Sequence, residues 1–177
     1  MTTDHGARKL GRPSRVMMGL LVAWLAAGQA LAQSTDLPNR KDPLEGITTA
    51  AQPNAEQLAA AAASGFKAVI DLRGPNEDRG MDEKTAVEGL GMSYISLPVE
   101  GADGVTYGNA SALDKLLSEI QGPVLIHCSS GNRAGALLAL RAKLNGADAE
   151  SALALGVAGG VTALKETVEQ KLAQGQD

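Results

Sequence analysis

The feature that most constrains the fold is an apolar strand that runs straight into a glycine-containing loop and then into a helix. Residues 123–135 read PVLIHCSSGNRAG, and the run from Val124 to His127 is typical of a strand buried on both faces. Two further strand-like runs, at residues 66–72 and 92–99, alternate along the chain with helical runs. This alternation predicts an α/β fold, with a central, mainly parallel sheet of about four strands and helices on both faces.

The loop in this run places a nucleophile beside an anion-binding group. A loop between a strand and a helix turns backbone N–H groups into its own concavity, and the helix N-terminus adds a partial positive charge. Gly131 permits the tight backbone path, and Arg133 offers a planar fork that suits a tetrahedral oxyanion. Cys128 lies in this positive field and is expected to favour its thiolate form. The arrangement predicts covalent catalysis on an anionic substrate, against the alternative of a buried cysteine in a plain connecting loop.

The first 32 residues have the pattern of a secretory signal peptide. Basic residues come first, the apolar run Val16 to Ala27 follows, and Ala30 to Ala32 form a small-residue cleavage site. The apolar run is shorter than the roughly 20 residues that a membrane-spanning helix needs. We therefore expect cleavage, export to the periplasm or beyond, and no stable membrane anchor afterwards. Residues 33–44 are polar and predict a flexible leader, and one domain is expected over residues 45–174.

The composition limits the partners and cofactors to be expected. The net charge is −4, and the chain has no basic run and no basic stripe with aromatics, so nucleic acid is not an expected partner. After signal cleavage His127 would be the only histidine and Cys128 the only cysteine. One histidine and one cysteine do not make a metal site, and we expect neither a metal nor another cofactor. The expected partner is a small anionic substrate that contains phosphate or sulfur, or a phosphoprotein.

Several residues outside the loop are candidates for supporting roles. A general acid could come from the glycine-rich segment at residues 100–108, where Asp103 is favoured over Glu100. Arg73 follows the first predicted strand, at the edge of the sheet where α/β sites collect, so it could assist anion binding. The alternative for Arg73 is an ion pair with a nearby acid: Asp71, Glu77 or Asp78.

The loop and the chain upstream of it resemble known families. The pattern HC-x-x-G-x-R after a buried strand resembles the active loop of cysteine-dependent phosphatases and of rhodaneses. The segments TAAQP, GFKAVIDLRGPNE and GMSYISLPV resemble the phosphatase-like domain of beta-lactamase hydrolase-like proteins. This resemblance covers roughly residues 45–145 and implies a protein-tyrosine-phosphatase-like fold.

The resemblance also implies roles for the loop residues by their position. Cys128 would be the nucleophile and Arg133 the anion clamp. The anion would be bound by the loop backbone and by the residue after the clamp: Ser129, Ser130, Gly131, Asn132 and Ala134. The side chain of His127 would turn away from the site and support the loop through hydrogen bonds.

Two departures from the phosphatase pattern leave the transferred group open. Four residues separate Cys128 from Arg133, where ordinary tyrosine phosphatases have five and rhodaneses have four. Ala134 stands where phosphatases usually carry a Ser or Thr hydroxyl. The leading hypothesis is a phosphatase-like hydrolase that acts on a phosphorylated substrate through a thiophosphate at Cys128. The alternatives are a sulfurtransferase that carries a persulfide on Cys128, and a non-catalytic module that binds anions or phospho-ligands.

Overall fold

The computed structural model describes residues 1–3 and 36–175 of the chain. The chain divides into two units, Met1–Leu31 and Ala32–Asp177, and the fold below is that of the second unit. Apart from residues 1–3, the predicted signal peptide lies outside the described residues. Where the structure describes the chain, no helix combines the length and the apolar character needed to cross a membrane.

A five-stranded sheet forms the centre of the described domain. Its strands are β1 (Lys41–Leu44), β2 (Ile47–Ala50), β3 (Ala68–Asp71), β4 (Ser93–Ser96) and β5 (Val124–His127). They lie in the order β1-β2-β5-β3-β4, so β5 occupies the centre. β1 pairs with β2 in antiparallel orientation, and the other neighbours pair in parallel. The predicted α/β fold with a mainly parallel sheet is confirmed, with one strand more than expected.

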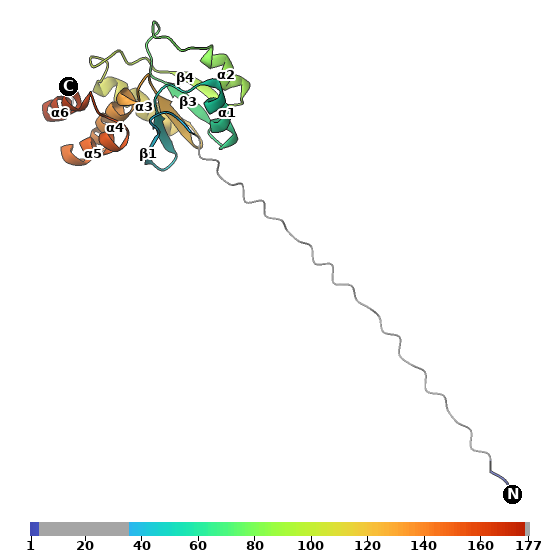
Figure 1. Ribbon diagram of the computed structural model, residues 1–177. Coiled ribbons are helices and arrows are strands. Elements are labelled where there is room, and N and C mark those ends of the chain that lie inside the picture. The colour runs from blue at the N-terminus through green and yellow to red at the C-terminus, as the bar shows by residue number, and fades with distance from the viewer. Residues whose placement is uncertain (4–35, 176–177) are drawn as a thin grey trace. The chain divides into compact units, whose positions relative to one another are not determined.

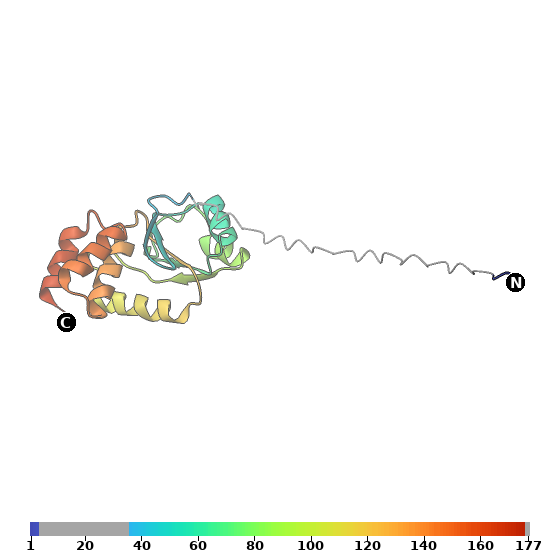
Figure 2. The same cartoon turned by 90° about the horizontal axis from the view of Figure 1, so that it is seen from below.

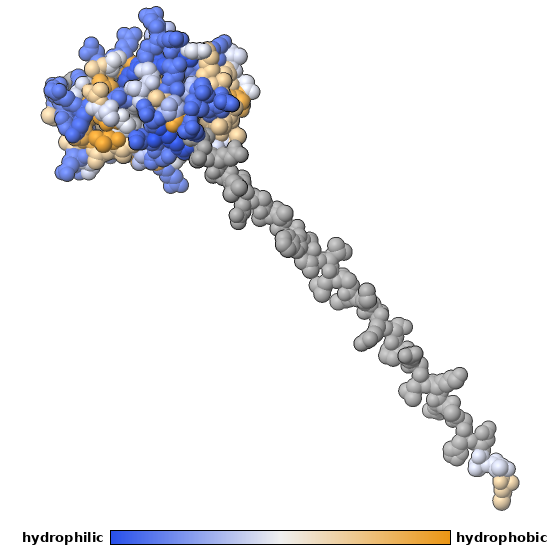
Figure 3. Space-filling view, viewed as in Figure 1, coloured by the Kyte–Doolittle hydropathy of each residue, from blue (hydrophilic) through white to orange (hydrophobic). Residues whose placement is uncertain are grey.

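Helices cover both faces of this sheet. In the described part of the chain they are α1 (Ala55–Ala63), α2 (Glu83–Gly89), α3 (Tyr107–Glu119), α4 (Asn132–Leu144), α5 (Ala149–Ala158) and α6 (Lys165–Gln174). Figures 1 and 2 show α1 and α2 on one side of the sheet and α3 to α6 on the other. The outer surface of these layers is mostly hydrophilic in the view of Figure 3, as expected for helices whose apolar faces are buried.

Side-chain alternation along the central strands divides the core into two layers. In β5, Val124 and Ile126 pack with residues of α3 to α6, whereas Leu125 packs with residues of α1 and α2. β3 shows the same alternation. Because successive side chains of a strand point to opposite faces, neighbours in the sequence here belong to different layers.

Three glycines bring α4 close to the end of α5. A Cβ on Gly135 would lie 2.6 Å from the carbonyl oxygen of Gly156 and 2.7 Å from that of Gly159. No larger residue fits at position 135 without a shift of backbone, so the approach of the two segments requires glycine there. The helix that follows the loop is therefore fixed against the turn between α5 and α6.

The leader predicted over residues 33–44 is wrong for its described part. Lys41–Leu44 form strand β1, and Leu37 is buried with 4% of its surface exposed. The segment KDPL has no strand pattern of its own. It forms a strand because it pairs with β2, not because it has an apolar face to bury. Residues 33–35 lie outside the described residues.

Candidate active site

Cys128 and His127 are neighbours in the sequence but lie on opposite faces of the sheet. His127 is the last residue of β5, and Cys128 follows it. Cys128 packs in the layer of Ile126 and α4, whereas His127 meets Glu83 of α2 on the other face. The strand therefore separates the predicted nucleophile from a buried polar cluster behind it.

The loop after Cys128 folds back over the sulfur atom. The backbone N–H of Gly131 donates a hydrogen bond to Cys128 Sγ at 3.1 Å. Gly131 has a φ of 94°, and α4 begins at the next residue, Asn132. A Cβ at position 131 would also lie 3.4 Å from the carbonyl oxygen of Ala50 in β2. Glycine at this position thus allows the loop to place a backbone donor on the sulfur.

Arg133 is held beside the loop by a carboxylate and a hydroxyl group. Its Nη1 donates to Glu77 Oε1 at 2.5 Å, and its Nη2 donates to Glu77 Oε2 at 2.7 Å. Nη2 also donates to Ser129 Oγ at 2.9 Å, and Nη1 donates to the carbonyl oxygen of Val99 at 2.9 Å. The hydrogen bonds with Glu77 raise the pKa of Arg133 and lower the pKa of Glu77, so both groups stay charged. Both hydrogens of Nη2 therefore have partners, so an oxyanion that binds Arg133 in place of Glu77 or Ser129 has to displace that partner.

A buried polar cluster of Asp71, Arg73, Glu83 and His127 lies on the other face of the sheet. Arg73 Nε donates to Asp71 Oδ1 at 2.9 Å, and Arg73 Nη2 also pairs with Glu83. His127 Nε2 lies 2.8 Å from Glu83 Oε1. Burial lowers the pKa of His127 to about 4, against the opposing charge of Asp71, so its imidazole is neutral near neutral pH. Burial alone would raise the pKa of Asp71, but hydrogen bonds from Arg73 outweigh it and bring that pKa to about 2.

The cluster locates two of the predicted supporting residues. The guanidinium of Arg73 is taken up by Asp71 and Glu83, so of the two sequence alternatives it forms the ion pair with an acid rather than an anion site. His127 lies behind the loop, against Glu83. Its support of the loop stays a prediction.

Three members of the cluster could in principle offer ligands to a metal. Asp71, Glu83 and His127 each present a ligand atom, and these atoms lie within 4.8 Å of one another. Arg73 donates to both carboxylates, so a divalent cation would meet a guanidinium at close range. These residues fit an arginine-neutralised cluster better than a metal site.

A cavity of about 370 Å³, here called the loop cavity, opens beside the loop at residues 128–133. Its lining comes from the chain after β3, the chain after β4, the loop with the start of α4, and the segment before α6: Glu77, Gly101, Ala102, Ser129, Ser130, Asn132, Arg133, Ala163 and Leu164. It thus brings together four of the predicted site residues and adds Glu77. Cys128 and Ala134 are fully buried and do not border this cavity.

The two general-acid candidates are exposed side chains near this cavity. Asp103 lies in the turn at residues 101–104, whose first two residues line the loop cavity. Glu100 lies near Glu77, the partner of Arg133. Both carboxylates face Gly74, where a Cβ would be 3.5 Å from Glu77 Oε1 and 3.8 Å from Glu100 Oε1. The assignment of Asp103 as the general acid stays a prediction.

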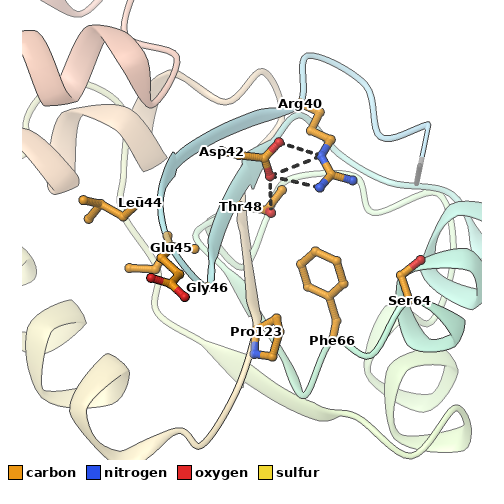
Figure 4. Close-up of a pocket in the computed structure, with 10 residues that line it drawn as sticks. Arg40, Asp42, Leu44, Glu45, Gly46, Thr48, Ser64, Phe66 and Pro123 are labelled. Atoms are coloured by element: carbon orange, nitrogen blue, oxygen red, sulfur yellow. Dashed lines mark hydrogen bonds and ion pairs between the residues drawn. The ribbon is translucent and has the colours of Figure 1, made fainter. Parts of the chain in front are cut away.

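A larger cavity, of about 670 Å³, lies at the opposite end of the strands. Its lining includes Phe66 and Pro123, which precede β3 and β5, and Figure 4 shows Arg40, Asp42 and Thr48 joined by hydrogen bonds at its side. Sites on parallel sheets form beyond the carboxyl ends of the strands, and this cavity lies at the amino ends. No cysteine or histidine lines it.

Sequence reasoning missed the roles of two acids and of one amide. The sequence predicts Glu77 as a possible partner of Arg73 and predicts no role for Glu83. Asn132 is expected only to contribute to anion binding, but its side chain accepts hydrogen bonds from the Thr162 N–H at 2.7 Å and the Thr162 hydroxyl at 3.1 Å. A usable signal existed for Glu77, because an arginine in an anion-binding loop needs a counter-charge when no anion is bound.

Comparisons of the sequence find relatives over the central part of the chain. Residues 43–145 match the model of the family described as beta-lactamase hydrolase-like protein, phosphatase-like domain. The beta-lactamase hydrolase-like protein of Agrobacterium fabrum is 35% identical over 106 residues, which are 58% of this chain and 24% of that protein. The protein of that name from Xylella fastidiosa is 31% identical over the same coverage. The chain thus spans about a quarter of the length of these curated relatives.

Solved structures share the fold. A candidate phosphatase from Neisseria meningitidis has a TM-score of 0.64 at 21% identity, over 75% of this chain and 97% of that one. A Cys-to-Ser variant of TpbA from P. aeruginosa, in complex with phosphotyrosine, has a TM-score of 0.57 at 25% identity, over 77% and 82% of the two chains. The core catalytic domain of the PP-IP phosphatase SIW14 from S. cerevisiae, in complex with citrate, has a TM-score of 0.55 at 17% identity, over 77% and 86%. Sulfur transfer finds no support among these proteins.

The family match and the structural likenesses agree with the geometry described above. The matched residues include the whole strand–loop–helix run and make up more than half of the chain. The chain therefore belongs to the family of phosphatase-like domains of beta-lactamase hydrolase-like proteins, and it has the fold of protein-tyrosine-phosphatase-like enzymes.

Proposed function

We propose that this protein is a phosphatase that acts on a phosphorylated substrate through Cys128. The observation that carries the proposal is the geometry of the loop, where a backbone N–H lies 3.1 Å from the Cys128 sulfur and Arg133 borders the adjoining cavity. A sulfur nucleophile beside an anion clamp suits attack on a phosphoryl group. Family membership supports the proposal, as does the phosphotyrosine complex of the TpbA variant.

The proposed reaction has two steps. First, the Cys128 sulfur forms a bond to phosphorus while the bond from phosphorus to the leaving oxygen breaks, and that oxygen takes a proton from Asp103. Water then loses a proton to the same carboxylate and attacks phosphorus, which breaks the S–P bond and releases inorganic phosphate. Arg133 and the loop N–H groups bind the non-bridging oxygens, whose charge grows in the transition states.

The experiment that tests the proposal offers the protein two donors. The purified protein and Cys128→Ser are each incubated with p-nitrophenyl phosphate and, separately, with thiosulfate plus cyanide, after circular dichroism has shown that both are folded. We expect nitrophenol from the wild type alone and no thiocyanate. Thiocyanate without nitrophenol would replace the proposal with sulfur transfer. Neither product, with retained binding of inorganic phosphate, would leave a binding module.

The assignment of the general acid has a matched test. Asp103→Asn should lower kcat about 100-fold and flatten the alkaline limb of the pH–rate profile, because the acid must be protonated to act. Glu100→Gln is the comparison, since both carboxylates are exposed and close in sequence. If Glu100→Gln flattens the profile and Asp103→Asn does not, the role passes to Glu100.

We also propose that the protein works in the periplasm or outside the cell. The support is the pattern of residues 1–32, with its basic start, short apolar run and small-residue end. N-terminal sequencing of the protein from the periplasmic fraction should give Gln33 as the first residue. An intact N-terminus in the cytoplasmic fraction would overturn the proposal.

A further inference from the structure

A second cavity borders the catalytic loop on the side of β1. Its volume is about 530 Å³, and it is here called the Lys41 cavity. It shares Ser130 and Asn132 with the loop cavity, so these two residues form a rim between the two hollows. An extended substrate whose phosphate lies at Arg133 can cross this rim into the Lys41 cavity.

The Lys41 cavity has an unusual charge for this protein. Its lining contains no acidic side chain and one cation, Lys41, although the whole chain has a net charge of −4. Among the described residues, Lys41 makes no ion pair. A lysine without an ion-pair partner, in a cavity that no acid lines, attracts a second negative group.

The position of Lys41 relative to the loop is fixed by the fold. Lys41 pairs with Thr49 in the β1–β2 ladder, and the nearby Asn39 Nδ2 donates to the carbonyl oxygen of Ser130 at 3.3 Å. A Cβ on Gly160 would lie 3.8 Å from Lys41 Cγ and 3.6 Å from the carbonyl oxygen of Gly131. The stem of Lys41 therefore lies close to the loop backbone, and its ammonium group extends from a fixed point.

The lining of both cavities also indicates what joins the two anionic groups. The described aromatic residues, Phe66, Tyr94 and Tyr107, line neither cavity. The lining of the loop cavity includes four small or aliphatic residues, namely Gly101, Ala102, Ala163 and Leu164. Without a ring to stack on, the site offers no preference for an aromatic ester.

We propose that Lys41 forms a second anion subsite, so that the preferred substrates are aliphatic phosphate esters with a second anionic group at the far end. This inference rests on the proposed phosphatase function and names its substrate class. The second group can be a phosphate or a carboxylate, because an ammonium group binds either as a point charge. Residues 39–41 and 157–162 lie outside the matched family domain, so the subsite would be a property of this chain rather than of the domain.

The test compares matched probes on wild type and variants. Hexanediol bisphosphate, with one phosphate at each end, is compared with hexanediol monophosphate, and phosphohexanoate serves as the carboxylate probe. After correction for its two equivalent ends, we expect the bisphosphate to have a KM about tenfold lower than the monophosphate. Lys41→Gln should abolish this ratio, and Lys41→Glu should invert it. Lys115→Gln, which removes an exposed lysine of α3, should keep the ratio.

A binding measurement separates failure of the subsite from failure of the phosphatase function. Calorimetric titration of Cys128→Ser with the same probes requires no turnover, and the affinity ratio should again be about tenfold and depend on Lys41. Absence of turnover with an intact, Lys41-dependent ratio would refute the phosphatase function and keep the subsite. Equal affinities for the bisphosphate and the monophosphate, or a ratio unchanged in Lys41→Gln, would overturn the subsite. Preference for phosphohexanoate over the bisphosphate would identify the second group as a carboxylate.

Discussion

Arg73 and Arg133 are both buried and both bound to carboxylates, but they differ in what surrounds the ion pair. The side chains of Arg73, Asp71 and Glu83 are all fully buried. The side chain of Arg133 is 9% exposed, and that of its partner Glu77 is 35% exposed at the edge of the loop cavity. A sealed pair can only hold the fold, whereas a pair that borders solvent can exchange a partner for a ligand. Burial, not residue type, thus predicts that Arg73 stabilises the fold and that Arg133 binds an anion.

The largest effect should come from breaking the sealed site. Arg73→Met leaves Glu83 buried without a counter-charge and leaves Asp71 with Arg79 alone, and we expect a loss of about 3–5 kcal/mol in the free energy of unfolding. The matched control is Arg79→Met, because Arg79 also pairs with Asp71 but is 24% exposed, and its loss should be about 1 kcal/mol or less. Urea denaturation measures both values. Equal losses would show that burial does not set the difference.

Substitution of Arg133, at the site open to solvent, should lower activity rather than stability. Arg133→Lys keeps the charge but removes the planar fork, so kcat/KM for p-nitrophenyl phosphate should fall about 100- to 1000-fold. The urea midpoint should move far less than in Arg73→Met. If Arg133→Lys instead lowered the urea midpoint strongly but kept full activity per folded molecule, the roles given to the two arginines would be reversed.

Acid should weaken the sealed site first. The pKa of His127 is about 4 in the folded protein and near 6.5 when unfolded, so the unfolded chain binds more protons between these values. Stability is complete above about pH 6.5 and should fall by up to about 3 kcal/mol as the pH drops to 4. The contribution of Asp71 is present above its unfolded pKa of 3.8 and is lost as the pH falls towards 2. Urea titrations of His127→Gln should lack the decline between pH 6.5 and 4, and a decline that persists there would contradict this assignment.

The smallest effect concerns the wall of the open site. Asn132→Ala removes the acceptor for the Thr162 N–H in the turn before α6, and by analogy with a lost helix cap it should cost about 1 kcal/mol. The Thr162 amide should exchange its hydrogen faster in this variant. Unchanged exchange would show that the turn is held by other contacts.

The sequence was sufficient where structure depends on local pattern. The run from Val124 to Arg133 contains its own strand, turn glycine and helix start. The loop and its place directly after a central strand could therefore be predicted. The pairing of Glu77 with Arg133 joins residues 56 positions apart, and only the sheet topology brings them together. Strand β1 was missed for the same reason, because its polar residues carry no signal until β2 supplies a partner.

The central claim is that Cys128 carries the phosphoryl group, and trapping the intermediate tests it most directly. Wild-type protein is quenched with acid during turnover of p-nitrophenyl phosphate, and the peptides are analysed by mass spectrometry. We predict a phosphoryl group on the peptide that contains Cys128, and none in Cys128→Ser. Steady turnover with no phosphoryl group on Cys128, or with one on another residue, would contradict the account.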